Sequence, residues 1–238
     1  MSAAALSASC FLAPRRAATA ASRDAAVAGL LERVPAFVVT NQQGLPYLTE
    51  IDIQGRRSGA VYLGVGEAAA LLEDVRMYDP NATLAIVPLA RVYPDVSKSV
   101  SEAVAARDVV PQPSASATSD MRLFRLQPLS DERAEEAALV PGSSSVPLFY
   151  IPSLVINVEG EERRPYFMRS TDLLSTWQRV RSDDAGEPSS TTAAKPALRV
   201  VGLERLLRQM ESEELEVVPI LLPPSETAEV LNLPRRTM

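Results

Sequence analysis

A glycine-rich hexapeptide is the first candidate for chemistry in this sequence. Gly64, Gly66 and Ala69 fit the pattern G-x-G-x-x-A between an expected strand and an expected helix, the setting of a dinucleotide-binding turn. Arg91 follows the next expected strand, where an NADP site can hold a basic residue. Glu67 opposes this interpretation, because it would place a negative charge beside a pyrophosphate at the helix start. An NADP-binding enzyme stays as an alternative hypothesis.

The residue inventory excludes most other enzymatic sites. The chain of 238 residues has no histidine, which rules out Ser-His-Asp triads, Cys-His dyads and the usual zinc enzymes. Cys10 is the single cysteine, so neither an intrachain disulfide nor a thiolate cluster can form. The carboxylates match no calcium loop, and the serines at 143–145 lack a G-x-S-x-G frame. We therefore expect a non-enzymatic protein without catalytic residues, cofactor or metal.

Aromatic side chains are the remaining candidates for a functional site. Aromatic and aliphatic side chains that line an exposed groove bind unfolded peptide without strict sequence demands. The alternative is that aromatic residues on strands fill the core. Six residues are predicted to bind peptide: Phe37, Tyr62, Phe149, Tyr150, Phe167 and Trp177.

Composition limits the class of partner. The hydrophobic fraction of 46% and the charged fraction of 23% are ordinary for a globular protein. The net charge of −6 argues against a nucleic-acid partner, which requires a basic patch or stripe. No stretch reaches the roughly 18 apolar residues that span a bilayer, so any membrane association would be peripheral.

The N-terminal segment has the composition of an organelle transit peptide. Residues 1–23 contain nine Ala, four Ser and three Arg but no acidic residue. The string from Ser9 to Pro14 looks like the Phe-centred cleavage region of bipartite leaders in algae with complex plastids. A disordered Ala-rich tail is the alternative. We predict a targeting segment over residues 1–23.

A repeated phrase indicates two related half-domains. Val-Pro-Ala-Phe stands at residues 34–37 and Val-Pro-Leu-Phe at residues 146–149. Each phrase is followed by a turn, a short strand and a helix that carries a Leu-Leu pair, at 71–72 and at 173–174. The pattern predicts an α+β fold in which two pseudo-repeated halves, residues 24–140 and 141–238, form mixed β-sheet with flanking helices.

Periodicity places the elements of both halves. In the first half, strands are expected over residues 37–40, 47–53, 60–63, 83–89 and 123–126, with helices over 27–34, 66–75, 96–106 and 130–139. In the second half, strands are expected over residues 148–151, 154–158, 165–168, 198–201 and 215–222, with helices beginning near residues 171 and 203. Leu173, Leu174, Trp177 and Val180 are predicted to point inward from the first of these helices. Residues 111–119 and 182–195 are expected to be loops.

The order of these motifs resembles the Tic twenty-two-like family. The resemblance rests on residues 34–41, the strand and Val-Tyr pair over 84–93, the runs at 146–149, 164–167 and 172–174, and the closing strand over 217–226. It implies a pseudo-symmetric fold with apolar grooves and a soluble component of plastid protein import. The implied location is the envelope intermembrane space, and the implied partners are preproteins and translocon components.

Three functions therefore follow from the sequence. The leading hypothesis is a plastid protein-import factor that binds preproteins in the manner of a chaperone. The second is a structural or assembly subunit of another plastid complex, such as a photosynthetic one. The third is the NADP-binding enzyme.

Overall fold

The computed structural model describes residues 20–51, 57–96, 123–129, 146–184, 196–212 and 214–227. The helix predicted over 130–139, the loop predicted over 111–119 and most of the predicted targeting segment lie outside the described residues. The predicted boundary between residues 140 and 141 also lies outside them, so the division into half-domains stays a prediction.

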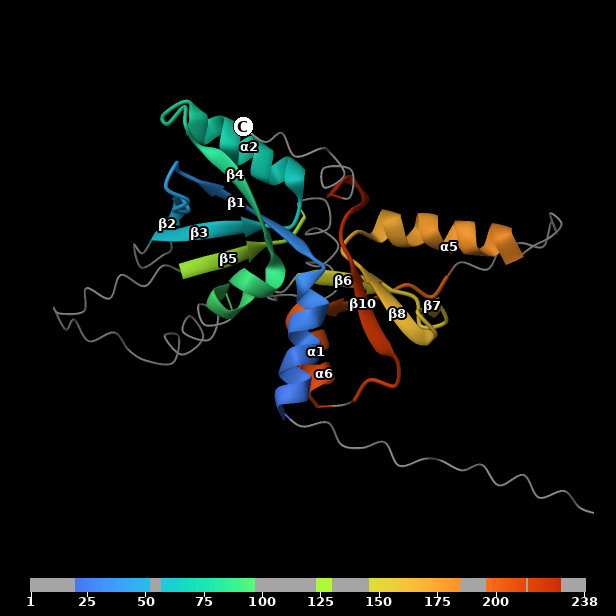
Figure 1. Cartoon of the computed structure of the whole chain (residues 1–238). Helices are drawn as coiled ribbons and strands as arrows, with labels where there is room; N and C mark the ends of the chain where they lie inside the picture. The colour runs from blue at the N-terminus through green and yellow to red at the C-terminus, as the bar shows by residue number, and fades with distance from the viewer. Residues whose placement is uncertain are drawn as a thin grey trace, which may run out of the picture.

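The first sheet, here called sheet A, contains five strands in the order β2-β3-β1-β4, with β5 parallel to β3 (Figure 1). Helix α1 precedes the sheet, and α2 connects β3 to β4. A further helical turn begins at Leu89, directly after β4, and is described as far as Val96. The elements are α1 (Ala20–Glu32), β1 (Pro35–Thr40), β2 (Leu48–Ile51), β3 (Arg57–Tyr62), α2 (Val65–Arg76), β4 (Thr83–Pro88) and β5 (Leu123–Gln127).

The second sheet, sheet B, repeats this connectivity. Its order is β10-β8-β6-β9, β7 pairs with β8, and β10 is parallel to β8 as β5 is to β3. The elements are β6 (Pro147–Tyr150), β7 (Ile156–Val158), β8 (Glu161–Phe167), α5 (Ser170–Asp184), β9 (Arg199–Gly202), α6 (Leu203–Glu211) and β10 (Val218–Leu222). The predicted α+β class with mixed sheets and flanking helices is confirmed.

Local chemistry explains where several elements begin and end. Pro35 cannot continue α1, and it starts β1 as predicted. Pro88 ends β4, where its missing N–H leaves the ladder intact. Two predictions need correction. The polar run from Glu161 to Arg164 belongs to β8, because β7 pairs with it in a hairpin. Residues 182–184 continue α5 instead of forming a loop.

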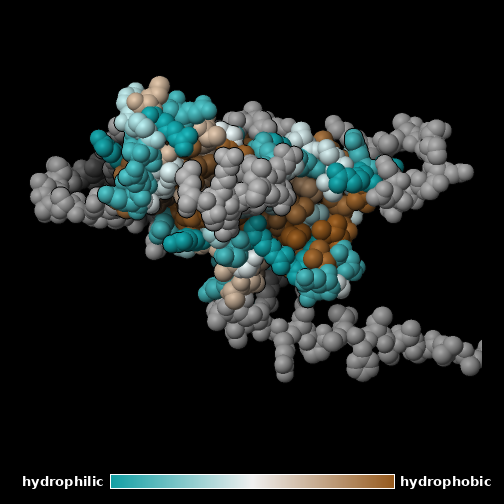
Figure 2. Space-filling view, turned by 45° about the horizontal axis from the view of Figure 1, so that its top comes forward, coloured by the Kyte–Doolittle hydropathy of each residue, from teal (hydrophilic) through white to brown (hydrophobic). Residues whose placement is uncertain are grey.

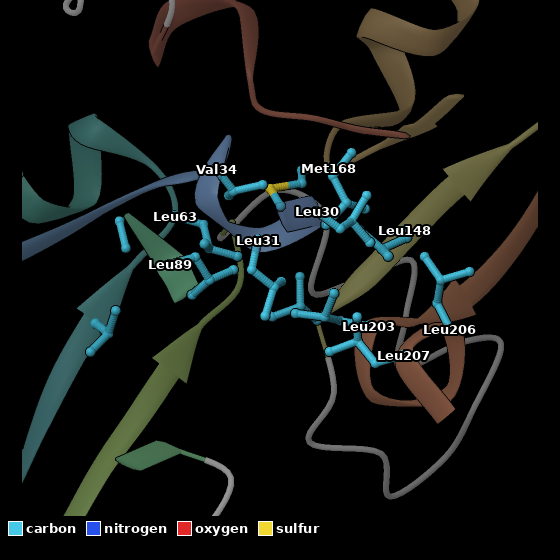
Figure 3. Packing of buried hydrophobic residues seen from close by; sticks show 14 of the residues in the cluster. Leu30, Leu31, Val34, Leu63, Leu89, Leu148, Met168, Leu203, Leu206 and Leu207 are labelled. Carbon is cyan, nitrogen blue, oxygen red and sulfur yellow. The ribbon is translucent and has the colours of Figure 1, made fainter. Parts of the chain in front are cut away.

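One large core joins the two sheets. Leu30 and Leu31 of α1 pack with Leu203, Leu206 and Leu207 of α6 in the cluster that Figure 3 shows. Leu63 and Leu89 from the sheet A side, and Leu148 and Met168 from sheet B, belong to the same cluster. Helix α1 therefore precedes sheet A in the chain yet packs along α6 and against β10 (Figure 1). Burial of these side chains couples both sheets in one folding unit.

The opposite face of each sheet has its own smaller core beneath a helix. Helix α2 covers sheet A, where Val39, Leu72 and Ala82 are buried together. Helix α5 covers part of sheet B, where Phe149, Phe167 and Leu173 form the corresponding cluster. Each sheet thus lies between α2 or α5 on one face and the shared core on the other.

Tyr93 gives the shared core a testable dependence on pH. Burial, together with the carboxylates of Glu204 and Glu211 on α6 and against the opposing charge of Arg208, raises the pKa of the Tyr93 phenol from 10.0 to about 12. The folded protein therefore keeps the proton up to about pH 12, whereas the unfolded chain loses it near pH 10. The stability from the neutral phenol is complete below pH 10 and is lost between pH 10 and pH 12.

We expect Tyr93→Phe to remove this loss. Between pH 8.5 and pH 11, the free energy of unfolding should fall by about 1–2 kcal/mol more in the wild type than in the variant, since Tyr93 is half-buried. Urea titrations at the two pH values measure the difference, and comparing the two proteins cancels the other tyrosines. The same pH dependence in both proteins would contradict the placement of Tyr93 against α6.

Candidate functional site

The strand register fixes which side chains share a face of sheet B. Phe149 pairs with Phe167, and both lie beneath α5. Because side chains alternate along a strand, every second residue counted from Phe167 faces the same side. On β10 these residues are Val218, Ile220 and Leu222, which pair with Arg163, Pro165 and Phe167. On β7 they are Ile156 and Val158.

Helix α5 covers only part of this face. It packs against β6 and β8, at the end of the sheet that holds Phe149 and Phe167. Val218 at the start of β10 is 45% exposed, while Ile156, Val158 and Ile220 are half-buried. Figure 2 shows the resulting apolar area between α5 and the hydrophilic turn that follows β7. We call Ile156, Val158, Val218 and Ile220, which lie on the same face as the buried Pro165, the apolar surface of sheet B.

Further side chains on the α5 side of sheet B are aromatic, aliphatic and charged. Trp177 on α5 is half-buried in the cluster of Phe149, and Leu174 on the same helix is 36% exposed. Leu174 was predicted to point inward with Trp177, so that prediction is wrong for Leu174. Arg163 lies on the same face of β8, and its guanidinium donates to the Glu161 carboxylate at 2.8 Å. Arg163 pairs with Val218 on one side and with Ile156 on the other, so a charged side chain lies between two apolar members of this face.

Sheet A differs from sheet B at the equivalent positions of the described residues. Tyr62 of sheet A corresponds to Phe167, since they pair with Phe37 and Phe149 in the same way. By the same register, Arg125 and Gln127 of β5 stand where β10 has Ile220 and Leu222. Arg125 is exposed and charged, so the corresponding face of sheet A is polar at this point. Among the described residues, the position of Ile220 on sheet B is therefore taken by a charged side chain on sheet A.

A polar clamp holds β10 and α5 together beside this surface. The Arg169 guanidinium donates to both carboxylate oxygens of Glu226, at 3.1 and 3.2 Å. One turn further along α5, the Asp172 carboxylate accepts from the main-chain N–H and the hydroxyl of Ser225, each at 2.9 Å. These bonds attach the segment after β10 to the start of the helix, at the opposite end of β10 from Val218.

A double-mutant cycle tests the clamp. We expect Arg169→Met and Glu226→Gln to be coupled by about 1 kcal/mol in the free energy of unfolding, because the pair is bidentate but partly exposed. Urea unfolding of the wild type, both single variants and the double variant gives the coupling. Effects that add within 0.3 kcal/mol would place the two side chains out of contact.

The six predicted peptide-binding aromatics are divided among different environments. Phe37 and Phe149 are 0% exposed and Phe167 is 4% exposed, so a partner cannot reach them while α2 and α5 stay packed. Tyr62 and Tyr150 are half-buried on different sheets, and Tyr150 packs on Tyr166 with ring centroids 4.9 Å apart, on the opposite face from Phe149. Trp177 is half-buried against the cluster of Phe149 and Phe167 beneath α5. A peptide-binding role for these residues stays a prediction.

Sequence reasoning missed the aliphatic residues of the apolar surface. The run from Leu215 to Leu222 was predicted to be the final strand, without a distinction between its two faces. An alignment of the last strands of the two halves could have found them, because it places the apolar Ile220 and Leu222 at the positions of the polar Arg125 and Gln127. Aromatic residues drew attention instead, although most of them lie in the core.

The glycine-rich turn does not form an open phosphate site. Gly64 precedes α2 in an extended conformation, and a Cβ placed on it would lie 2.0 Å from Oε2 of Glu67. The Glu67 carboxylate thus lies over the helix start, where a pyrophosphate would have to bind. The described residues contain no group of three or more His, Cys, Asp or Glu side chains that could hold a metal. This geometry opposes the NADP hypothesis.

The chain is a two-sheet α+β protein with an apolar surface on sheet B. A family model described as the Tic22-like family matches residues 3–230, so the chain belongs to the Tic22-like family, whose members are components of protein transport. The described helices include none with the length and apolar character needed to cross a membrane.

Two solved structures share the fold. Anabaena Tic22, described as a protein-transport protein, is 18% identical, with a TM-score of 0.59 and coverage of 90% of this chain and 99% of its own. Tic22 from Plasmodium falciparum is 15% identical, with a TM-score of 0.60 and coverage of 87% and 96%. No curated protein matches the sequence. At these identities the two structures support the fold alone.

Proposed function

We propose that the protein is a plastid protein-import factor that binds unfolded preproteins in the envelope intermembrane space and keeps them from aggregating. The apolar surface of sheet B is the observation that carries this proposal. It presents aliphatic side chains around the Arg163–Glu161 ion pair, so most of its contact with a client is apolar and suits many unfolded segments. Family membership and the Ser- and Arg-rich segment over residues 1–23 support the plastid location.

The area of this surface favours weak and reversible binding. A handful of half-buried aliphatic residues is much smaller than a standard interface of roughly 800 Å² per partner. Each additional methylene buried in the complex contributes about 0.8 kcal/mol to the binding free energy. The entropy lost when the client becomes ordered offsets a large share of that gain. Micromolar affinity and fast release follow, as an import factor requires when it passes its client on.

Trp177 is the single tryptophan of the chain and provides a direct test. Reduced and carbamidomethylated ribonuclease A is an unfolded, basic polypeptide without tryptophan, so any change in emission on titration comes from Trp177. We expect a saturable change in Trp177 emission and slower aggregation of heat-denatured citrate synthase. Unchanged emission together with unchanged aggregation would remove the proposed function. Native ribonuclease A serves as the control client and should have no effect.

A further inference from the structure

The outer edge of β4 carries unpaired main-chain groups. β4 pairs with β1 in antiparallel register, and the Leu89 N–H donates to the Val34 carbonyl at 2.7 Å. In antiparallel pairs only alternate residues bond to the partner strand. The Val34–Leu89 bond therefore shows that the main-chain N–H and C=O groups of residues 83, 85 and 87 point toward β1. Those of Leu84 and Ile86 point away from it. Within the described part of the chain, no group accepts from the amides of Leu84 and Ile86.

The outer edge of sheet B at β10, which corresponds to β5 of sheet A, is protected. The Met168 N–H donates to the Leu222 carbonyl at 3.3 Å, which turns alternate residues of β10 toward β8. The main-chain groups of Pro219, Leu221 and Pro223 then point away from β8, and the two prolines have no N–H to donate. Proline at an edge is a common means of preventing the addition of another strand.

The other outer strands are also less open than β4. Phe124 and Gln127 on β5 already have interaction partners. β9 has four residues, begins with the charged Arg199 and ends at Gly202, which caps α6. β4 has six residues without a charge, and its Ile86 is 46% exposed. Figure 1 shows β4 in front of β1, extending from the end of α2 to the helix that begins at Leu89.

Alternating unpaired N–H and C=O groups match the backbone of another extended segment and few other ligands. Binding by strand addition takes affinity from main-chain hydrogen bonds, with side chains of alternate residues adding selectivity. The protein carries a net charge of −6, so two copies repel each other, whereas an uncharged segment is not repelled and a basic segment is attracted. The occupant that fits best is thus an extended, uncharged or basic stretch of a foreign polypeptide.

We propose that the outer edge of β4 binds one extended segment of the client polypeptide as an added strand. The segment exchanges main-chain hydrogen bonds with Leu84 and Ile86, and one of its apolar side chains packs on Ile86. This inference rests on the proposed function and adds a second contact, on sheet A, to the apolar surface of sheet B. The main-chain contact is independent of client sequence, which suits a protein that handles many clients.

The test uses a fluorescein-labelled peptide of twelve residues, alternating Val and Thr with Lys at both ends, and fluorescence anisotropy. Ile86→Pro removes one outward N–H and keeps the bond of Val87 to β1, so we expect about tenfold weaker binding. Ile86→Ala keeps that N–H and loses only side-chain contact, so we expect a loss of at most about threefold. Equal affinity of Ile86→Pro and the wild type would overturn the proposal.

A modified peptide tests the same contact without altering the protein. N-methylation of two adjacent central residues blocks both edges of the peptide, and it should weaken binding to the wild type by about tenfold or more. Undiminished binding of the methylated peptide would overturn strand addition, even if Ile86→Pro fails to fold. A wild type that forms a concentration-dependent dimer through this edge and binds no peptide would assign the edge to a second copy and overturn the proposal.

The outcomes separate this inference from the proposed function. If Ile86→Pro binds the peptide normally and still suppresses aggregation, only strand addition at β4 fails. If the wild type neither binds unfolded ribonuclease A nor suppresses aggregation, the proposed function itself fails.

Discussion

Replacing Phe149 by alanine is expected to lower the free energy of unfolding by about 3–5 kcal/mol. The side chain is 0% exposed in the cluster that joins β6, β8 and α5, and it pairs with Phe167 across the strands. Truncation removes this apolar contact and leaves a cavity that the helix above can fill only in part. The loss is a large fraction of the 5–15 kcal/mol that typically stabilises a domain.

Urea unfolding followed by Trp177 emission measures this loss, because Trp177 lies in the same cluster. Phe149→Leu is the matched control and should cost less than about 1.5 kcal/mol, since leucine refills most of the volume. A stability within 1 kcal/mol of the wild type for Phe149→Ala, combined with reduced client affinity, would show that Phe149 is a binding residue and not a core residue.

The sequence predicts the elements well because their signals are local. Pro35 and Pro88 mark the ends of helix and strand, and apolar periodicity identifies α2, α5 and α6. The duplicated Val-Pro-x-Phe phrase correctly predicted β1 and β6, which occupy equivalent places in the two sheets. The packing of α1 on α6 was not predictable in this way, because it joins segments far apart in the chain.

The candidate site was predictable only in part, because exposure depends on which neighbours cover a face. Phe149 and Ile220 both stand on the α5 side of sheet B, yet the helix covers one fully and leaves the other half-buried. The extent of that cover depends on the direction in which α5 crosses the strands, which hydrophobic periodicity does not encode. The open edge of β4 was likewise not predictable, because which edge of a strand stays unpaired depends on the order of the strands in the sheet.

The second large effect concerns the apolar surface of sheet B. Val218→Asp is expected to weaken client binding by about tenfold, because burying a charge against an apolar client costs more than the lost methyl contacts alone. The Val218 side chain is 45% exposed and faces solvent at the start of β10, so the substitution leaves the core clusters intact. The variant should therefore unfold at nearly the same urea concentration as the wild type.

Tyr78→Asp provides the control for this variant. Tyr78 is 87% exposed after the end of α2, at sheet A, so the substitution adds the same charge to an exposed apolar position away from the surface. General electrostatic attraction of a basic client changes equally in both variants.

The measurement that tests the central claim most directly is the dissociation constant of unfolded ribonuclease A for the wild type, Val218→Asp and Tyr78→Asp, each determined from Trp177 emission. The account predicts binding about tenfold weaker for Val218→Asp and within twofold of the wild type for Tyr78→Asp. Equal dissociation constants for Val218→Asp and the wild type would contradict the claim that the apolar surface of sheet B holds the client.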